Sequence, residues 1–320
     1  AGILSGDVSL LSAAITLIES ANPRHRKLAE QIIEECLPHS GKSIRVGITG
    51  VPGVGKSTFI ESFGTFLTTQ ERKVAVLAID PSSQKSGGSI LGDKTRMEDL
   101  STNKNAYVRP SPAKGSLGGV ARNTRETIIL CEAAGYDTIL IETVGVGQSE
   151  TTVKGMVDFF LLLMLAGAGD ELQGIKRGIM EMADAVVITK ADGENINNSK
   201  RAKIEYKNAL HLFPASESNW IPSVSICSAY DNVGIDDVWK TIQSYQNQTT
   251  INGYFEHKRK AQSKYWMYET INEELKRTFF NHPEISKEIK IIEQKVTEGA
   301  LSPFKAAHLL LAKNLKHEFN

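Results

Sequence analysis

A short segment with three glycines, a lysine and a serine is the clearest sign of chemistry in the sequence. It follows an apolar run, precedes a helical pattern, and reads Gly50-Val51-Pro52-Gly53-Val54-Gly55-Lys56-Ser57. This is the setting and the spacing of the phosphate-binding pattern G-x-x-x-x-G-K-[ST], in which main-chain amides at a helix N-terminus surround phosphate oxygens. We expect the loop and Thr58 to bind a nucleoside triphosphate, with Lys56 on the β- and γ-phosphates and Ser57 on Mg²⁺.

A second pattern indicates which purine is bound. The apolar run Ala185–Thr189 ends in Thr189-Lys190-Ala191-Asp192, which resembles the guanine-specificity motif N/T-K-x-D, with threonine where asparagine is commoner. A carboxylate at Asp192 can accept hydrogen bonds from the N1–H and amino groups of guanine. Adenine lacks both donors and would leave the carboxylate unpaired, so we expect strong discrimination. The stem of Lys190 would cover the base.

A serine-alanine pair lies further along the chain. Ser228-Ala229 follows the apolar run Val224–Cys227 and resembles the element whose main-chain N–H groups meet the guanine oxygen. The pair is a weak signal alone, but it comes in the expected order after the phosphate loop and Asp192. We therefore add Ser228, Ala229 and Tyr230 to the expected site for GTP and GDP.

Acidic residues at the ends of apolar runs are candidates for a magnesium site. Asp80 follows Val74–Ile79, and Glu142 follows Thr138–Ile141. Asp93 lies in the glycine- and serine-rich stretch after Asp80. Mg²⁺ prefers carboxylate, hydroxyl, phosphate and water oxygens. The expected metal ligands are Ser57, Asp80, Asp93 and Glu142, and the expected catalytic residues are Lys56, Asp93, Glu142 and Gln148.

Bulk composition excludes several classes of protein. Among 320 residues, Lys+Arg and Asp+Glu both total 37, which argues against a nucleic-acid or anionic-membrane surface. The most apolar run, Val157–Leu165, falls far short of the roughly 20 residues that span a bilayer. Three separated cysteines, Cys36, Cys131 and Cys227, indicate reduced thiols. We expect a cytoplasmic protein.

Short apolar runs alternating with helical patterns position these motifs. Strands that are apolar on both faces and separated by helices predict an α/β fold, a P-loop NTPase with a mostly parallel sheet flanked by helices. Ligands of such sheets bind at the carboxyl ends of the strands. The expected strands are Ile44–Thr49, Val74–Ile79, Thr138–Ile141, Val157–Leu165, Ala185–Thr189 and Val224–Cys227, and the expected helices are Lys56–Thr68, Val120–Ala134, Glu171–Met182 and Ser199–Leu210.

Helical extensions are expected on both sides of this domain. Asp7 can cap one N-terminal helix, and Asn22-Pro23 can begin a second. The charged tail after about Tyr245 has a helical pattern that is broken near Pro283 and Pro303. We therefore expect an N-terminal helical extension over 1–41, a GTPase domain over 42–246, and a C-terminal helical dimerisation arm over 247–320.

Longer strings make the sequence similar to the MeaB/ArgK-type GTPases of the SIMIBI class. The resemblance covers roughly residues 5–245, and we expect it to extend into the helical tail. It rests on Asp80-Pro81-Ser82-Ser83, on the string from Gly87 to Met97, on Glu142-Thr143-Val144-Gly145-Val146-Gly147-Gln148-Ser149-Glu150, and on the string GAGDELQGIKR from Gly167 to Arg177.

The resemblance implies a homodimeric GTPase that serves an adenosylcobalamin-dependent acyl-CoA mutase, of the methylmalonyl-CoA mutase type. It implies that residues 81–93 and 144–150 are switches, with Gly145 near the γ-phosphate. A third switch over 167–177 would contain Asp170 and Lys176. Lys114 stands where many members have arginine, so the role of its loop stays open.

Two other functions compete with this one. A nickel metallochaperone GTPase would require His- or Cys-based ligands, but the seven histidines are scattered and no C-x-x-C occurs. A P-loop kinase or transport-associated ATPase would require an acceptor site and a base, and the sequence offers neither.

Overall fold

The computed structural model describes residues 1–20, 22–79, 97–110, 117–143, 149–167, 177–214 and 216–318. The chain forms two compact units, Ala1–Gln262 and Ser263–Asn320. Within the described residues, no helix is both long enough and apolar enough to cross a membrane.

A seven-stranded sheet, parallel throughout, forms the centre of the first unit. Its strand order is β3-β2-β4-β1-β5-β6-β7, and β1 therefore lies in the middle. The predicted α/β fold is confirmed, and six strands lie within two residues of the expected ranges. The seventh, β3, was not expected. The strands are β1 (Ile44–Gly50), β2 (Val74–Ile79), β3 (Ala106–Arg109), β4 (Thr138–Thr143), β5 (Phe159–Leu165), β6 (Ala185–Thr189) and β7 (Ser223–Ile226).

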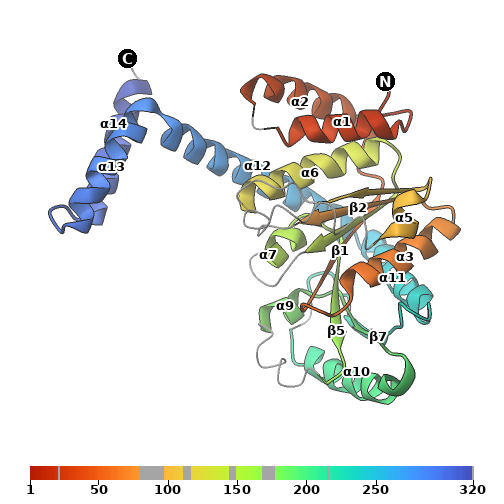
Figure 1. The fold of residues 1–320 in the computed structure, drawn as a ribbon. Helices are drawn as coiled ribbons and strands as arrows, with labels where there is room; N and C mark the ends of the chain where they lie inside the picture. The colour runs from red at the N-terminus through yellow and green to blue at the C-terminus, as the bar shows by residue number, and fades with distance from the viewer. Residues whose placement is uncertain are drawn as a thin grey trace. The chain divides into compact units, whose positions relative to one another are not determined.

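Helices cover both faces of the sheet because successive strand residues, which point to opposite faces, are apolar. In β5, Leu161 and Leu163 belong to the core cluster shared with α3 and α11. Leu162 and Met164 belong instead to the cluster shared with α9 and α10. Figure 1 shows α3 and α11 on one side of the sheet, and α6, α7 and α9 on the other. The helices are α3 (Lys56–Thr69), α5 (Glu98–Thr102), α6 (Leu117–Ala133), α7 (Ser149–Lys154), α9 (Arg177–Met182), α10 (Ile196–Leu210) and α11 (Ile235–Ile251).

Two N-terminal helices, α1 (Val8–Ile18) and α2 (Pro23–Cys36), pack against each other and against α6. The Asp7 carboxylate accepts hydrogen bonds from the amides of Ser9 and Leu10, at 2.8 and 3.0 Å. The side chain of Asn22 caps α2 in the same way. The predicted cap at Asp7 and the predicted helix start at Asn22-Pro23 are confirmed, and a 3₁₀ turn over Leu37–His39 follows α2.

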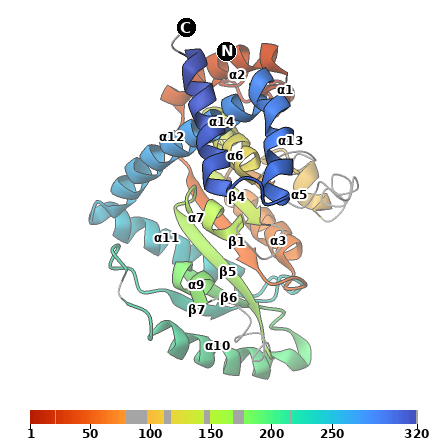
Figure 2. The same ribbon diagram turned by 90° about the vertical axis from the view of Figure 1, so that its left-hand side faces the viewer.

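The tail is helical and is interrupted at the predicted prolines. Helix α12 (Tyr254–Asn281) begins in the first unit and continues into the second, which also contains α13 (Pro283–Thr297) and α14 (Pro303–Glu318). Figure 2 shows α13 and α14 side by side. Ile285 and Ile292 of α13 and Ala306 and Leu310 of α14 form a small buried core between these two helices.

Candidate functional site

The phosphate-binding loop connects β1, the middle strand, to the N-terminus of α3. Gly50 allows a close approach of β5, because a Cβ there would lie 2.5 Å from the carbonyl oxygen of Leu163. Gly53 and Gly55 have φ angles of +78° and +90°, a conformation that disfavours any side chain. Gly55 is also the N-cap of α3. The glycines expected from the motif therefore occupy positions where the backbone requires them.

Lys56 lies against its own loop. Its ammonium donates a hydrogen bond to the carbonyl oxygen of Gly50 at 2.8 Å. Burial lowers the pKa of Lys56, while the nearby carboxylates of Glu142 and Glu150 oppose that effect. The ammonium group is thus held in a partly desolvated position between carboxylates, where its charge acts more strongly than in water.

Two expected metal ligands come together beside Lys56. The hydroxyl of Ser57, in the first turn of α3, lies 3.5 Å from Oε1 of Glu142. Glu142 is buried near the end of β4 and is paired in register with Ile48 of β1. Hydroxyl and carboxylate oxygens are the donors that Mg²⁺ prefers. The described part of the expected magnesium site therefore has the right chemistry in one place.

The carboxyl end of β6 contacts the phosphate loop directly. The buried hydroxyl of Thr189 donates to the carbonyl oxygen of Val54 at 2.7 Å. The ammonium of Lys190 donates to the carbonyl oxygen of Gly53 at 2.9 Å. Lys190 has a φ of +54°, which is uncommon for a residue with a side chain and is typical of functional sites. The guanine motif and the phosphate loop are therefore one connected structure.

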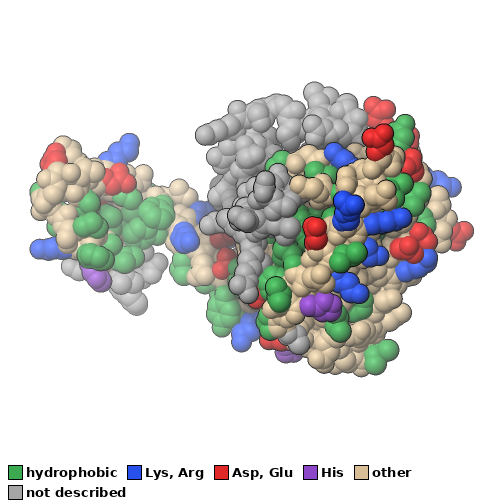
Figure 3. Space-filling view, turned by 90° about the horizontal axis from the view of Figure 1, so that it is seen from below, with side chains coloured by type: hydrophobic (Ala, Val, Ile, Leu, Met, Phe, Trp, Pro, Cys, Tyr) green, Lys and Arg blue, Asp and Glu red, His purple; other side chains and the backbone are tan. Residues whose placement is uncertain are grey.

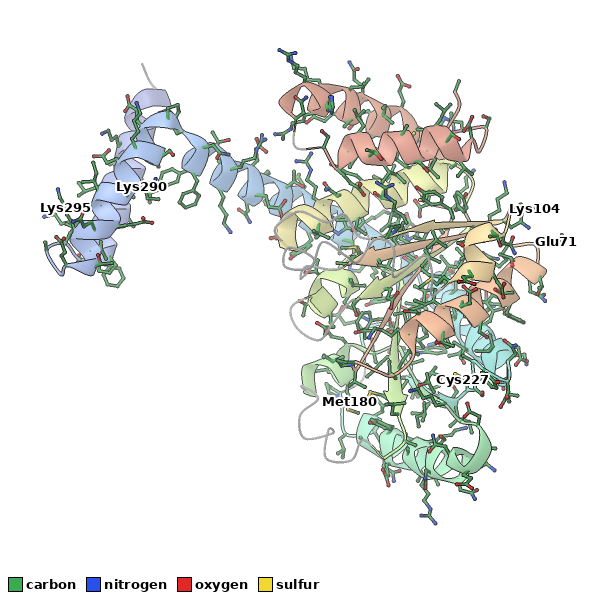
Figure 4. All side chains as sticks on the ribbon, in the orientation of Figure 1. Glu71, Lys104, Met180, Cys227, Lys290 and Lys295 are labelled. Carbon is green, nitrogen blue, oxygen red and sulfur yellow. The ribbon has the colours of Figure 1, made fainter. Side chains whose placement is uncertain are left out.

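Asp192 and Ser228 also meet, as the sequence predicted for a common purine site. The hydroxyl of Ser228 donates to Oδ2 of Asp192 at 2.8 Å and accepts from the amide of Asp231 at 3.0 Å. The strand ends are joined by a bond of 3.0 Å from the amide of Ala191 to the carbonyl oxygen of Cys227, which directly follows β7 and is labelled in Figure 4. One carboxylate oxygen of Asp192 is thereby fixed by the serine.

The remaining expected nucleotide residues are placed near these groups or lie outside the described residues. Thr58 is exposed in the first turn of α3, Ala229 is half-buried, and Tyr230 is 86% exposed. The residues outside the described ranges are Asp80, Asp93, Gly145, Gln148, Asp170, Lys176 and Lys114, together with nearly all of the expected switches 81–93, 144–150 and 167–177.

The structure adds groups to which the sequence gave no role. Glu150, in the first turn of α7, is fully buried, and its carboxylate raises the pKa of Lys56 against the effect of burial. The hydroxyl of Thr143 donates to that of Thr49 at 2.9 Å, which joins the ends of β4 and β1. Glu150 belongs to the string 142–150 that supports the family resemblance, but the sequence gave no sign that its side chain is buried.

A phosphate loop after the middle strand of a parallel sheet, tied to a T-K-x-D motif after β6, defines a P-loop GTPase. The chain belongs to the family described as methylmalonyl Co-A mutase-associated GTPase MeaB, whose model matches residues 11–284. The resemblance inferred from the sequence is thereby confirmed, as is the GTPase activity.

Named relatives agree with this family. The chain is 51% identical to the methylmalonic aciduria type A homolog, mitochondrial, of Mus musculus, across 97% of this chain and 77% of that protein. It is 45% identical to the GTPase ArgK of Escherichia coli, across 93% and 90%. A solved structure titled LAO/AO transport system kinase matches with a TM-score of 0.77 and 37% identity, across 98% and 95%.

Proposed function

We propose that this GTPase is a chaperone of an adenosylcobalamin-dependent acyl-CoA mutase of the methylmalonyl-CoA mutase type. In this role it gates cofactor loading and protects or reactivates the mutase. The observation that supports the proposal most is the family match over residues 11–284, since the family is described as associated with that mutase. The comparisons lend no support to a nickel metallochaperone, a kinase or a transport ATPase.

The site supports a division of labour in GTP hydrolysis. Lys56 places its charge on the β- and γ-phosphates, where negative charge develops as water attacks in line. Ser57 and Glu142, with Asp80 and Asp93, would hold Mg²⁺, which when bound supplies further positive charge at the phosphate oxygens. Gln148 is proposed to orient the attacking water.

The purine side of the site has its own test. Asp192→Asn replaces one carboxylate oxygen by an NH₂ group, which donates hydrogen bonds. The carboxylate is the group proposed to accept hydrogen bonds from the N1–H and amino groups of guanine. Each hydrogen bond to a charged group contributes about 1.5–3 kcal/mol, so we expect GDP affinity to fall at least about 100-fold. Xanthosine diphosphate, which has a carbonyl in place of the amino group, should gain affinity. Calorimetry with both nucleotides measures this, and an unchanged preference for guanosine would contradict the assignment.

The partner is tested by purifying the chain with candidate mutases and measuring GTP hydrolysis with and without them. We expect slow hydrolysis alone and acceleration by the cognate mutase. Full-speed hydrolysis in the isolated protein that no mutase changes would overturn the chaperone proposal, while leaving the GTPase intact.

A homodimer is proposed on the same family basis, with residues 247–320 as its arm. Within the second unit, Tyr268, Ile271 and Leu275 of α12 are 53%, 46% and 64% exposed, and apolar side chains at this helical spacing usually need a partner. Basic and acidic side chains both appear on the face that Figure 3 shows.

A further inference from the structure

The side chain of Asn195 does not cap the helix that it precedes. Asparagine is among the residues most favoured at a helix N-cap, where its side-chain oxygen accepts a hydrogen bond from a first-turn amide. Asn195 is the N-cap of α10, yet it makes no side-chain cap hydrogen bond. Its side-chain amide instead donates to the carbonyl oxygen of Lys190 at 2.7 Å. The hydrogen bond of this side chain is therefore made to the T-K-x-D motif and not to the helix.

Asn195 in fact contacts both of the residues of that motif that are expected to bind guanine. Its main-chain amide donates to the carbonyl oxygen of Asp192 at 2.9 Å, in addition to the side-chain bond to Lys190. Between these two residues, the amide of Ala191 donates to the carbonyl oxygen of Cys227. The main chain of the motif is thus held on one side by the residue that follows β7 and on the other by Asn195.

Lys190 needs such a contact because of its backbone conformation. Its φ of +54° lies in the left-handed region, which a residue with a side chain keeps only where the surrounding structure holds it there. Lys190 is exposed, so packing gives this conformation little support. From this conformation its ammonium reaches the carbonyl oxygen of Gly53 in the phosphate loop at 2.9 Å. The bond from Asn195 fixes the carbonyl of Lys190 and therefore the direction of the chain that follows it.

We propose that Asn195 is a positioning residue for the guanine base, acting through Lys190. Its side-chain amide stabilises the left-handed conformation in which the stem of Lys190 lies beside the phosphate loop, where it can cover the base. The proposal rests on the proposed function, in which Lys190 and Asp192 bind the guanine nucleotide. Asn195 need not touch the nucleotide in this role.

Aspartate at position 195 separates this role from that of a helix cap. Aspartate has nearly the same shape as asparagine and caps helices about as well, but its carboxylate has no N–H to donate to the Lys190 carbonyl. We expect both Asn195→Asp and Asn195→Ala to raise the GDP dissociation constant about three- to tenfold in calorimetry, as for the loss of one hydrogen bond. Wild-type GDP affinity in Asn195→Asp would mean that the side chain acts only as a cap, and would overturn the proposal.

Two other asparagines provide matched controls. Asn197→Asp adds the same charge at an exposed position in the first turn of α10, so it measures the effect of charge alone. Asn252→Ala removes a similar bond, from a side-chain amide to the carbonyl oxygen of Ser218 at 2.8 Å, at the end of α11. Both controls should bind GDP as the wild type does. A loss in Asn195→Asp no larger than in Asn197→Asp, or in Asn195→Ala no larger than in Asn252→Ala, would contradict the proposal.

A double-mutant cycle tests the route through Lys190. Asn195→Ala keeps the main-chain amide that binds Asp192, so it removes only the bond to Lys190. If Asn195 acts through the lysine side chain, Asn195→Ala should change GDP affinity less than about twofold once Lys190→Ala is present. Fully additive losses would show that Asn195 acts by another route and would overturn the proposal.

The cycle also separates this proposal from the one on which it rests. Wild-type GDP affinity in Lys190→Ala would overturn the nucleotide-binding role of Lys190, and the role of Asn195 with it. A loss in Lys190→Ala with none in Asn195→Ala would overturn the role of Asn195 alone.

Discussion

Removing the Thr189 hydroxyl tests whether the guanine motif supports the phosphate loop. Thr189→Val preserves the shape of the side chain and deletes the donor to the Val54 carbonyl oxygen, 2.7 Å away. Thr189 is 2% exposed and Val54 is fully buried, so water cannot readily replace the bond. The substitution therefore isolates one interaction between β6 and the loop.

The expected loss follows from that burial. A typical hydrogen bond contributes about 0.5–1.5 kcal/mol, and a buried acceptor left unsatisfied costs about 1–3 kcal/mol. We expect the free energy of unfolding to fall by about 1–2 kcal/mol. Because the carbonyls of Gly53 and Val54 are both held by the end of β6, losing one bond should also raise the GDP dissociation constant about three- to tenfold.

The assays are urea unfolding and GDP calorimetry, with Thr249→Val as the matched control. Thr249 is fully buried, and its hydroxyl donates to the carbonyl oxygen of Tyr245 within α11 at 2.7 Å, far along the chain from the site. In this control the free energy of unfolding should fall by at most about 1 kcal/mol, and GDP should bind as it does to the wild type. If Thr189→Val bound GDP as the wild type does and unfolded at the same urea concentration, the bond would not be supporting the loop.

Two further predictions concern the ion pairs and buried lysine at the start of α12, within the first unit. Asp158 accepts from Nε and Nη2 of Arg259 at 2.8 and 2.6 Å and from the amide of Arg45 at 2.8 Å. Asp158→Ala should therefore lower the free energy of unfolding, measured by urea titration, by about 3–5 kcal/mol. A loss below about 1 kcal/mol would mean that the Asp158–Arg259 ion pair contributes no more than a solvent-exposed pair. Burial lowers the pKa of Lys258 from 10.5 to about 8 in the folded protein. Between these two pH values the unfolded chain therefore binds more protons than the folded one. The free energy of unfolding should rise with pH over this range, by at most about 1.4 kcal/mol per pH unit. Unfolding measured from pH 7 to 10 should lose this component in Lys258→Met, and an identical slope in that variant would show that another group is responsible.

The sequence predicted those parts of the site that depend on strand order. The carboxyl ends of parallel strands lie at the same edge of a sheet. Glu142 and Asp192 each follow an apolar run, so both were expected at the edge where the phosphate loop begins. The contact of Ser57 with Glu142 and that of Asp192 with Ser228 follow from this rule. The sequence predicted that these residues lie at one edge of the sheet, but not the individual hydrogen bonds between them.

The parts that escaped prediction lack a local signal. Strand β3 has four residues, of which only Tyr107 is buried, so it shows no apolar run. It is recognisable only by its pairing with β2. Helix α5 is too short to show a period, and Met97 gives no capping signal. Its true cap, Glu61, is separated from Asp99 by 38 residues, a distance over which no spacing rule applies.

The support that the end of β6 gives to the phosphate loop should not depend on the metal. The end of β6 holds the loop's own carbonyls through Thr189 and Lys190, so a change there should weaken nucleotide binding whether or not Mg²⁺ is present. GDP affinity measured with and without Mg²⁺ in Thr189→Val tests this expectation. A loss of GDP affinity that appears only when Mg²⁺ is present would mean that the Thr189 bond acts through the metal site and not on the loop.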